Sequence, residues 1–337
     1  MSEVQTVEYT ARDFSSDQEV KWCPGCGDYA ILKAVQKAMP LVGRKREDVV
    51  FVSGIGCSSR FPYYMDTYGF HSIHGRAPAL ASGVKLANPN LSVWQITGDG
   101  DALAIGGNHF IHAIRRNMGL NILLFNNRIY GLTKGQFSPT TDLGHKTKSS
   151  PQGVIDNPFH PGELVLGAQG HFFARCVDIN PAHMTGIMVE AEKHEGTSLV
   201  EILQNCIIFN DKVFSDYTSK ETKSDALLYV EHGKPMIFGK ESDKGLVLRG
   251  FELEVVTIGE NGITEDDILV HDANVKNPTL HFMMVRMEYP MILGVIRNVA
   301  AEPFEKKLAK QVLEVEKKSN FKTIDDLLLS GETWEIV

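Results

Sequence analysis

An acidic and an amide side chain follow two neighbouring predicted strands, at points suited to binding a divalent metal. Asp99 stands directly after the apolar run 92–97, and Asn127 stands just after the next apolar run, 121–125. Because the carboxyl ends of parallel strands meet at one edge of a sheet, we expect Asp99 and Asn127 to lie side by side. Carboxylate and amide oxygens are hard ligands that suit Mg²⁺ and leave positions on the metal for phosphate oxygens. The sequence therefore predicts Mg²⁺ and a phosphate-bearing ligand at this edge.

The surroundings of Asp99 suit an anion. Gly98 and Gly100 let the backbone approach a phosphate closely, and a predicted helix over 102–118 directs free N–H groups to the same place. Gly-Asp-Gly alone is also a common strand-ending turn. The paired asparagines are more specific, because the 30 residues from Gly98 to Asn127 resemble the thiamine-diphosphate motif. That resemblance implies metal binding by Asn127 and by the backbone carbonyl of Ile129.

Four of the five cysteines stand where they could meet. Cys23 and Cys26 form a Cys-x-x-Cys pair ahead of a predicted helix, while Cys57 and Cys206 each follow a predicted strand. Four thiolates can hold Zn²⁺ or an iron–sulfur cluster, and the spacing does not choose between them. The Cys23–Cys26 pair alone could also be a redox dithiol. Cys176 lies in an apolar run and is predicted to be a core residue.

Strand-like and helix-like segments alternate along the chain and would position these groups. The patterns predict strands over 49–53, 92–97, 121–125 and 198–203, and helices over 28–39, 77–86, 102–118 and 304–318. Pro40 is expected to end the first helix, and 280–285 is strand-like. This alternation predicts a doubly wound, mostly parallel α/β sheet.

The composition narrows the class of protein. The chain has 337 residues, of which 43% are hydrophobic and 23% charged, so it can bury a large core without disulfides. Its net charge of −8 argues against nucleic acid or an anionic membrane as a partner. No apolar run approaches the ~20 residues of a membrane helix, and the N-terminus resembles neither a signal nor a transit peptide. We therefore expect a soluble, cytoplasmic protein whose cysteines are metal ligands or catalytic groups.

Five motifs together resemble a known family. They are Trp22-Cys23-Pro24-Gly25-Cys26-Gly27, Gly54-Ile55-Gly56-Cys57-Ser58, His74-Gly75-Arg76-Ala77, Gly98-Asp99-Gly100-Asp101 and Leu132-Thr133-Lys134-Gly135-Gln136. In this order they resemble the β subunit of 2-oxoacid:ferredoxin oxidoreductases, most closely the 2-oxoglutarate branch. The part that carries the motifs runs from about residue 20 to residue 211.

The resemblance implies two cofactors and a reaction. A [4Fe–4S] cluster would be bound by Cys23, Cys26, Cys57 and Cys206, beside Mg²⁺-thiamine diphosphate. The coenzyme would be lined by Ile55, Gly56, Cys57, Ser58, Gly98, Gly100, Asp101, Gly131 and Leu132. The implied reaction is the oxidative decarboxylation of 2-oxoglutarate with coenzyme A to succinyl-CoA and CO₂, with electrons passing through the cluster to ferredoxin. Run in reverse with a strong reductant, the same site would fix CO₂.

The resemblance also implies a partner. Most thiamine enzymes need a glutamate near the pyrimidine ring of the coenzyme, on a separate domain for which this chain has no room. An α subunit would supply it in an α₂β₂ heterotetramer, and the chain alone would be inactive. We expect an N-terminal arm over 1–20, the cofactor-binding α/β domain over 21–210, and an extension over 211–337 that packs on the core and on the partner subunit.

Three further residues are candidates to face the substrate. Arg60 stands three residues after Cys57, and Lys134 stands in the loop after the metal ligands, so either could bind the second carboxylate of 2-oxoglutarate. Both could equally be surface residues. His74 could contact the coenzyme or the substrate, or be structural. His109 and His112 share a helix face without an evident third metal ligand, which favours core or surface roles.

Two other functions remain open from the residues alone. One is the same reaction with pyruvate or a branched-chain 2-oxoacid as substrate. The other is a zinc-binding or dithiol redox protein that uses no thiamine.

Overall fold

The computed structural model describes residues 8–336, so the first seven residues of the expected N-terminal arm lie outside the described part. Its centre is an eight-stranded sheet with the strand order β2-β1-β3-β4-β6-β5-β11-β7. The strands are β1 (Val49–Ser53), β2 (Tyr68–His71), β3 (Ser92–Gly98), β4 (Asn121–Asn126), β5 (Phe172–Val177), β6 (Ser198–Leu203), β7 (Leu227–Val230) and β11 (Met291–Asn298). Strands β1 to β6 are parallel, whereas β11 pairs antiparallel with β5 and parallel with β7.

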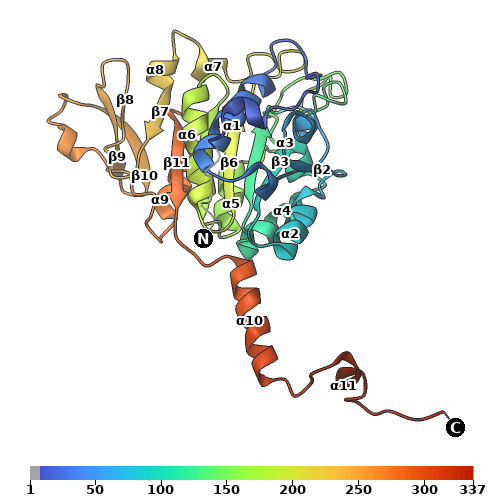
Figure 1. Ribbon diagram of the computed structural model, residues 1–337. Helices are drawn as coiled ribbons and strands as arrows, with labels where there is room; N and C mark the ends of the chain where they lie inside the picture. Colours follow the sequence, from blue (N-terminus) through green and yellow to red (C-terminus); the bar gives the residue numbers. More distant parts are fainter. Residues whose placement is uncertain (1–7, 337) are drawn as a thin grey trace.

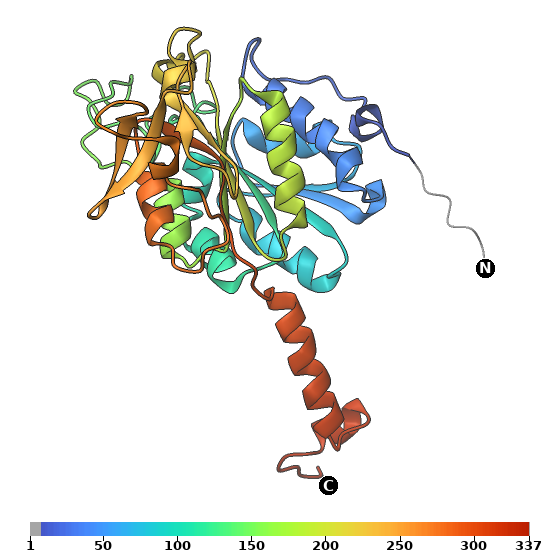
Figure 2. The same cartoon turned by 90° about the vertical axis from the view of Figure 1, so that its left-hand side faces the viewer.

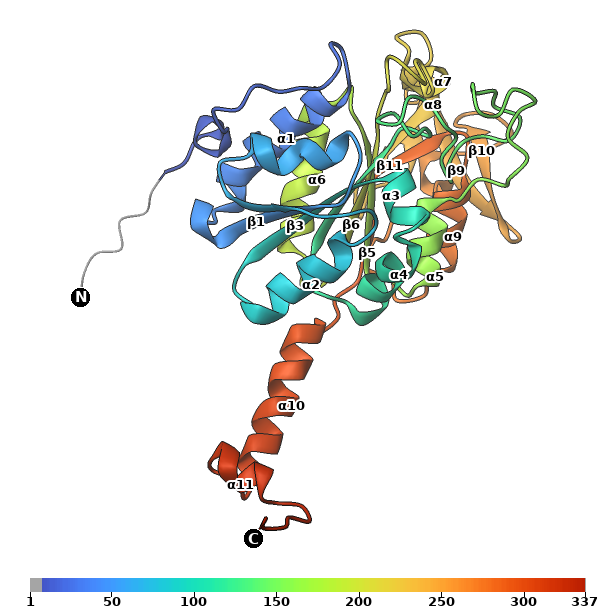
Figure 3. The ribbon, with the colours of Figure 1, turned by 90° about the vertical axis from the view of Figure 1, so that its right-hand side faces the viewer.

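Helices cover both faces of this sheet (Figure 3). The helices are α1 (Asp28–Val42), α2 (Ala77–Ala87), α3 (Asp99–Leu103), α4 (Gly107–Arg116), α5 (Pro161–Gly167), α6 (Pro181–Lys193) and α9 (Thr279–Arg286). Helices α1 and α6 pack on one face, and α2, α4, α5 and α9 on the other. The predicted doubly wound, mostly parallel α/β fold is therefore confirmed.

Successive side chains of each buried strand point to opposite faces of the sheet, and so they form the two halves of the core. In β4, Ile122 and Leu124 face the α2–α4 side, whereas Leu123 and Phe125 face the α1–α6 side. All six residues of β4 are buried, as expected for a parallel strand covered on both faces. The four predicted strands lie at their predicted positions, with β3 and β4 each one residue longer.

The helix predicted over 102–118 is wrong as a single element. It is split into α3 and α4 by a turn at 104–106. Gly75 presses against this turn, since a Cβ at Gly75 would lie 2.5 Å from the Cα of Gly106. A Cβ at Gly106 would lie 2.4 Å from the carbonyl oxygen of Asp101, so this turn requires glycine.

Two other expectations are corrected. Helix α1 continues through Pro40 to Val42, because the proline falls in the last turn and the N–H of Gly43 closes that turn on the carbonyl of Met39. The strand expected over 280–285 is helix α9, whose residues His281, Met284 and Val285 form its buried face at helical spacing.

The chain after residue 210 contributes to the main sheet through β7 and β11. It also contains short helices α7 (Ser215–Thr218) and α8 (Lys223–Ala226), and a second sheet of β8 (Ile237–Phe238), β9 (Lys244–Arg249) and β10 (Glu252–Thr257). Helices α10 (Phe304–Lys318) and α11 (Ile324–Leu328) project from the body on the side opposite to α7 (Figures 1 and 2). Within residues 8–336 no helix is long and apolar enough to cross a membrane.

Candidate active site

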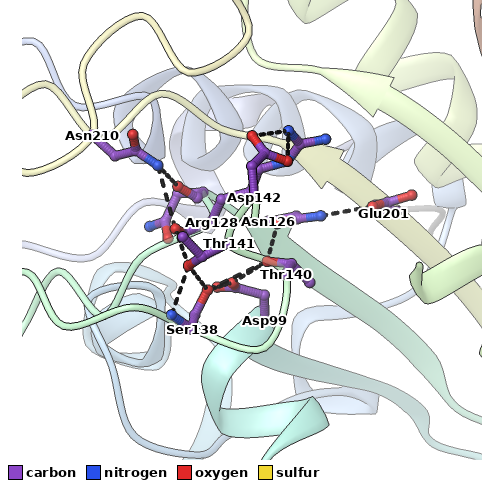
Figure 4. Close-up of polar contacts among 10 residues, drawn as sticks. Asp99, Asn126, Arg128, Ser138, Thr140, Thr141, Asp142, Glu201 and Asn210 are labelled. Carbon is purple, nitrogen blue, oxygen red and sulfur yellow. Dashed lines mark hydrogen bonds and ion pairs between the residues drawn. The ribbon is translucent and has the colours of Figure 1, made fainter. Parts of the chain in front are cut away.

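Asp99 is fixed at the carboxyl edge of the sheet by two hydroxyl groups (Figure 4). It is the first residue of α3, directly after β3, and only 2% of it is exposed. Ser138 Oγ and Thr140 Oγ1 each donate a hydrogen bond of 2.5 Å to the same oxygen, Oδ2. Burial raises the pKa of the Asp99 carboxyl, and the two hydroxyl donors oppose that rise.

Asn127 lies at the same edge, one strand away. Its Nδ2 donates to Gln204 Oε1 at 2.8 Å, and its Oδ1 accepts from the backbone N–H of Ile129 at 3.1 Å. Asn210 Nδ2 donates to the carbonyl of Asn127 at 3.0 Å, which ties this loop to the segment after β6. The side chain of Asn127 is therefore held in one orientation.

The predicted metal and coenzyme residues line one cavity of about 440 Å³, which we call the coenzyme cavity. Asp99, Asn127 and Ile129 lie in its wall. So do all the residues predicted to line the coenzyme: Ile55, Gly56, Cys57, Ser58, Gly98, Gly100, Asp101, Gly131 and Leu132. The roles of these residues remain predictions, but the structure brings every one of them together.

Asp101 joins three segments of the cavity wall. Its Oδ1 accepts the backbone N–H groups of Gly75 at 2.7 Å and Ile55 at 3.2 Å, and its Oδ2 accepts from Thr97 Oγ1 at 2.9 Å. A Cβ at Gly54 would lie 1.9 Å from Asp101 Oδ2, so the close approach requires glycine there. The carboxylate of Asp101 thus sets the shape of the cavity from within its wall.

Tyr130 closes the cavity over Gly100. Its hydroxyl donates to the carbonyl of Gly100 at 3.1 Å, and a Cβ at Gly100 would lie 2.1 Å from the tyrosine ring. The second glycine of Gly-Asp-Gly is therefore required by Tyr130, which the sequence analysis did not identify. The signal was its position three residues after Asn127, inside the loop that contains Ile129.

The four predicted cysteine ligands line a second cavity of about 290 Å³, which we call the cysteine cavity. Cys23 is exposed and Cys206 is buried. The sulfurs of Cys57 and Cys206 flank Gly131, each 3.5 Å from the place of a Cβ there. Within residues 8–336, however, no three His, Cys, Asp or Glu side chains are already arranged as a metal site. Cys176 is fully buried in the core, as predicted.

The environment of the thiols disfavours a simple dithiol. Burial raises the pKa of the Cys26 thiol far above its usual value and that of Cys57 to about 12. A reactive redox dithiol requires the opposite shift. A bound metal supplies the positive charge that converts such thiols to thiolates. Gln204 Nε2 lies 3.4 Å from Cys26 Sγ, as a hydrogen-bond donor to that sulfur.

Asp28 lies in the wall shared by the two cavities and was missed by the sequence analysis. It is the first residue of α1 and is only 1% exposed. Neither of its carboxylate oxygens has a hydrogen-bond partner among the described residues, and burial raises its pKa to about 7. Its position directly after the Cys-x-x-Cys-Gly motif was the available signal.

The residues predicted to face the substrate are divided between the cavities. His74 is exposed and lines the coenzyme cavity. Arg60 and Lys134 are exposed and line the cysteine cavity instead. His109 and His112 lie on α4, where His109 Nε2 contacts the guanidinium of Arg76.

Comparison with known proteins agrees with this site. Residues 54–202 match the family model described as thiamine pyrophosphate enzyme, C-terminal TPP binding domain. The fold and the coenzyme cavity therefore define a thiamine pyrophosphate-binding α/β domain.

The similarity to known proteins extends beyond this domain. The chain is 49% identical to the 2-oxoglutarate oxidoreductase subunit KorB of Mycobacterium tuberculosis, over 96% of this chain and 88% of that protein. It is 44% identical to the 2-oxoacid:ferredoxin oxidoreductase subunit beta of Saccharolobus solfataricus, over 59% and 66% of the two chains. The structure resembles 2-oxoglutarate:ferredoxin oxidoreductase from Magnetococcus marinus with 2-oxoglutarate, coenzyme A and succinyl-CoA bound, with a TM-score of 0.78, 28% identity and 98% coverage of both chains. The chain belongs to the family of 2-oxoacid:ferredoxin oxidoreductase β subunits.

Proposed function

We propose that this chain is the β subunit of a 2-oxoglutarate:ferredoxin oxidoreductase, which converts 2-oxoglutarate and coenzyme A to succinyl-CoA and CO₂ and reduces ferredoxin. The observation that carries the proposal is the shared wall between the two cavities. Cys57, Gly131, Leu132, Asn127, Gln204 and Asp28 line both of them. A decarboxylation site and an electron-accepting site would therefore be in direct contact.

The coenzyme cavity fits Mg²⁺-thiamine diphosphate. Asp99, Asn127 and the carbonyl of Ile129 offer the hard oxygen donors that Mg²⁺ binds. When bound, thiamine diphosphate supplies the electron sink for decarboxylation of a 2-oxoacid. The chain's own contribution is to hold the metal ligands still: Ser138 and Thr140 orient Asp99, and Gln204 orients Asn127.

The cysteine cavity fits a [4Fe–4S] cluster. It offers four thiols, the number that such a cluster takes, and a wall of apolar side chains that includes Ile207. When bound, the cluster supplies one-electron redox chemistry. The N–H of Gln204 that faces Cys26 would stabilise negative charge on that sulfur. Cys57 lies between Gly56 and Ser58 in the sequence and lines both cavities, so one segment of chain would contact both cofactors.

A partner subunit would complete the site. Ile105 and Leu132 line the coenzyme cavity yet are more than half exposed, which favours burial against another chain. The projecting C-terminal segment also exposes large apolar side chains, among them Leu313, Leu328 and Trp334. We propose that both surfaces contact the α subunit of an α₂β₂ assembly. Such an assembly would operate in the cytoplasm.

Anaerobic co-purification with the neighbouring subunit tests the proposal directly. We expect thiamine diphosphate, Mg²⁺ and four iron atoms with four sulfides per β chain, and CoA-dependent oxidation of 2-oxoglutarate. A clear preference for pyruvate or a branched-chain 2-oxoacid would change the substrate but keep the reaction. One zinc per chain without sulfide or thiamine diphosphate would refute the proposal.

A further inference from the structure

Asp178 is a buried carboxylate that lies one residue behind the wall of the cysteine cavity. It follows β5 directly, is 7% exposed and lines neither of the two cavities. It contacts Gly27 and Asn205, which are the sequence neighbours of Cys26 and Cys206. Burial of a carboxylate costs free energy unless hydrogen bonds compensate it, so its place between two cysteine-bearing segments needs a physical reason.

The segment that contains Cys206 is bound to Asp178 through one backbone N–H group. Asp178 Oδ2 accepts a hydrogen bond from the N–H of Asn205 at 2.8 Å. The carbonyl of Asn205 accepts from the N–H of Gly27 at 3.2 Å and from Gln204 Nε2 at 2.6 Å. Both polar backbone groups of Asn205 are therefore bonded, and the peptide that leads into Cys206 is held in one orientation.

The segment that contains Cys26 packs against the same carboxylate oxygen. A Cβ at Gly27 would lie 2.1 Å from Asp178 Oδ2, so this close approach requires glycine. Gly27 is the N-cap of α1, and the dipole of that helix favours a negative charge at its N-terminus. Burial raises the pKa of Asp178, and the backbone N–H groups of Asn205 and Ile179 oppose that rise. Donors of this kind suit an ionised carboxylate.

We propose that Asp178 is a positioning residue for the four-cysteine site: it holds the segment of Cys26 against the segment of Cys206 and keeps a negative charge behind both. This inference rests on the proposed function, because it concerns a cluster bound by these cysteines. Negative charge near an iron–sulfur cluster opposes the added electron and lowers the reduction potential of the cluster. The charge of Asp178 thereby makes the reduced cluster a stronger electron donor.

Two substitutions in the anaerobically prepared, assembled enzyme separate the hydrogen bond from the charge. Asp178→Asn keeps an oxygen that can accept the N–H of Asn205 but removes the charge, whereas Asp178→Ala removes both. Asp211→Asn is the matched control, because Asp211 is exposed and accepts a hydrogen bond from the side chain of the same Asn205 at 2.9 Å. Iron, sulfide and thiamine diphosphate are measured in each variant, and the reduction potential of the cluster is determined by a redox titration followed by electron paramagnetic resonance.

We expect Asp178→Asn to keep its iron and to favour cluster reduction about tenfold, which is a rise of about 59 mV in the potential of a one-electron couple. The shift in Asp211→Asn should be much smaller, because water and salt screen an exposed charge. Asp178→Ala should lose about half of its iron or more. Its thiamine diphosphate content should stay at the wild-type level, because Asp178 does not line the coenzyme cavity.

Three results would each overturn the inference. The first is a potential in Asp178→Asn that shifts no further than in Asp211→Asn, and the second is full iron content in Asp178→Ala. The third is an equal loss of iron and thiamine diphosphate in Asp178→Ala, which would indicate a general folding defect. Absence of iron and sulfide from the wild-type enzyme would instead refute the proposed function.

Discussion

Two buried polar clusters in this chain resemble each other in burial but not in their surroundings. At the carboxyl edge of the sheet, Asp99 lines the coenzyme cavity and Asp28 lines both cavities, and Asp28 has no hydrogen-bond partner among the described residues. Around β11, the guanidinium of Arg297 donates to the carbonyls of Gly170, Val275 and Lys276, and Nη1 lies 3.0 Å from His281 Nδ1. The polar groups of the second cluster form hydrogen bonds with one another and with nearby carbonyls. Neither Arg297 nor His281 lines either of the two cavities.

This contrast shows when a perturbed ionisable group indicates a functional site. Burial shifts the pKa of Asp28 upwards and that of His281 downwards, and both shifts are large. A perturbed pKa by itself therefore does not mark a functional site. The site is marked by polar groups that face a cavity and whose hydrogen bonds the chain leaves open.

The largest effect is expected for the cysteine cavity. Cys206→Ser removes one thiol from a four-thiol set, because serine is a poor ligand for iron. We predict loss of most of the iron and of ferredoxin reduction by the assembled enzyme, measured by iron and sulfide analysis and visible absorption. The matched control is Cys176→Ser, which changes a buried core cysteine that lines neither cavity. Equal iron content in the Cys206 variant and the control would remove Cys206 from the ligand set.

The second effect concerns the coenzyme cavity. Asp99→Asn keeps an oxygen to accept the hydroxyl hydrogen bonds of Ser138 and Thr140 but removes the charge that attracts Mg²⁺. We predict that affinity for Mg²⁺-thiamine diphosphate falls about 100-fold, which corresponds to about 2.7 kcal/mol. Bound thiamine is measured after gel filtration. Asp142→Asn is the control, because Asp142 forms an exposed ion pair with Arg128. Normal thiamine retention in Asp99→Asn would make the metal assignment wrong.

The carboxyl edge could be predicted because its geometry follows from topology. Parallel strands place their last residues at one edge, so the positions of Asp99, Asn127, Cys57 and Cys206 after four strands sufficed to bring them together. Ser138 and Thr140 could not be found this way. They come from the long connection between β4 and α5, which has no hydrophobic period to place it.

Strands β5 and β7 were not predicted, for a related reason. Strand β5 is apolar apart from Arg175, whose guanidinium is paired with Glu201 of β6 at 2.7 Å in the interior. The apolar run around Cys176 was recognised as core, but Arg175 interrupts it, so no strand was predicted there. The four-residue strand β7 joins the sheet only through β11, which is a contact between segments far apart in the sequence. Such a pairing has no local signal.

A smaller effect is expected where Tyr130 covers the carboxyl edge. Gly100→Ala places a methyl group 2.1 Å from the tyrosine ring, so either the ring or the α3 backbone must move. We predict a loss of about 2–3 kcal/mol in the free energy of unfolding, measured by urea denaturation, together with weaker coenzyme retention. Gly83→Ala is the matched control, because it lies in the interior of α2 with nothing within 4 Å of the new Cβ. It should gain about 0.5–1 kcal/mol. Equal stability of the two variants would mean that Tyr130 does not restrict this position.

The smallest effect concerns the cluster of Arg297 and His281 and the pH dependence of the stability that it gives the fold. Burial, with Arg297 next to it, lowers the pKa of His281 in the folded chain to about 4. Between pH 6.5 and 4 the unfolded chain therefore binds a proton at this histidine that the folded chain does not, so stability falls as the pH falls. From pH 7 to pH 5 we predict a loss of about 1–2 kcal/mol from His281 alone. His281→Gln should flatten the pH dependence of the urea midpoint by that amount, whereas His160→Gln at an exposed position should not. Coenzyme content of the folded His281→Gln protein should stay normal, because this cluster faces neither cavity. A loss of thiamine diphosphate in that variant would break the distinction between a cluster that supports the fold and an edge that binds ligands.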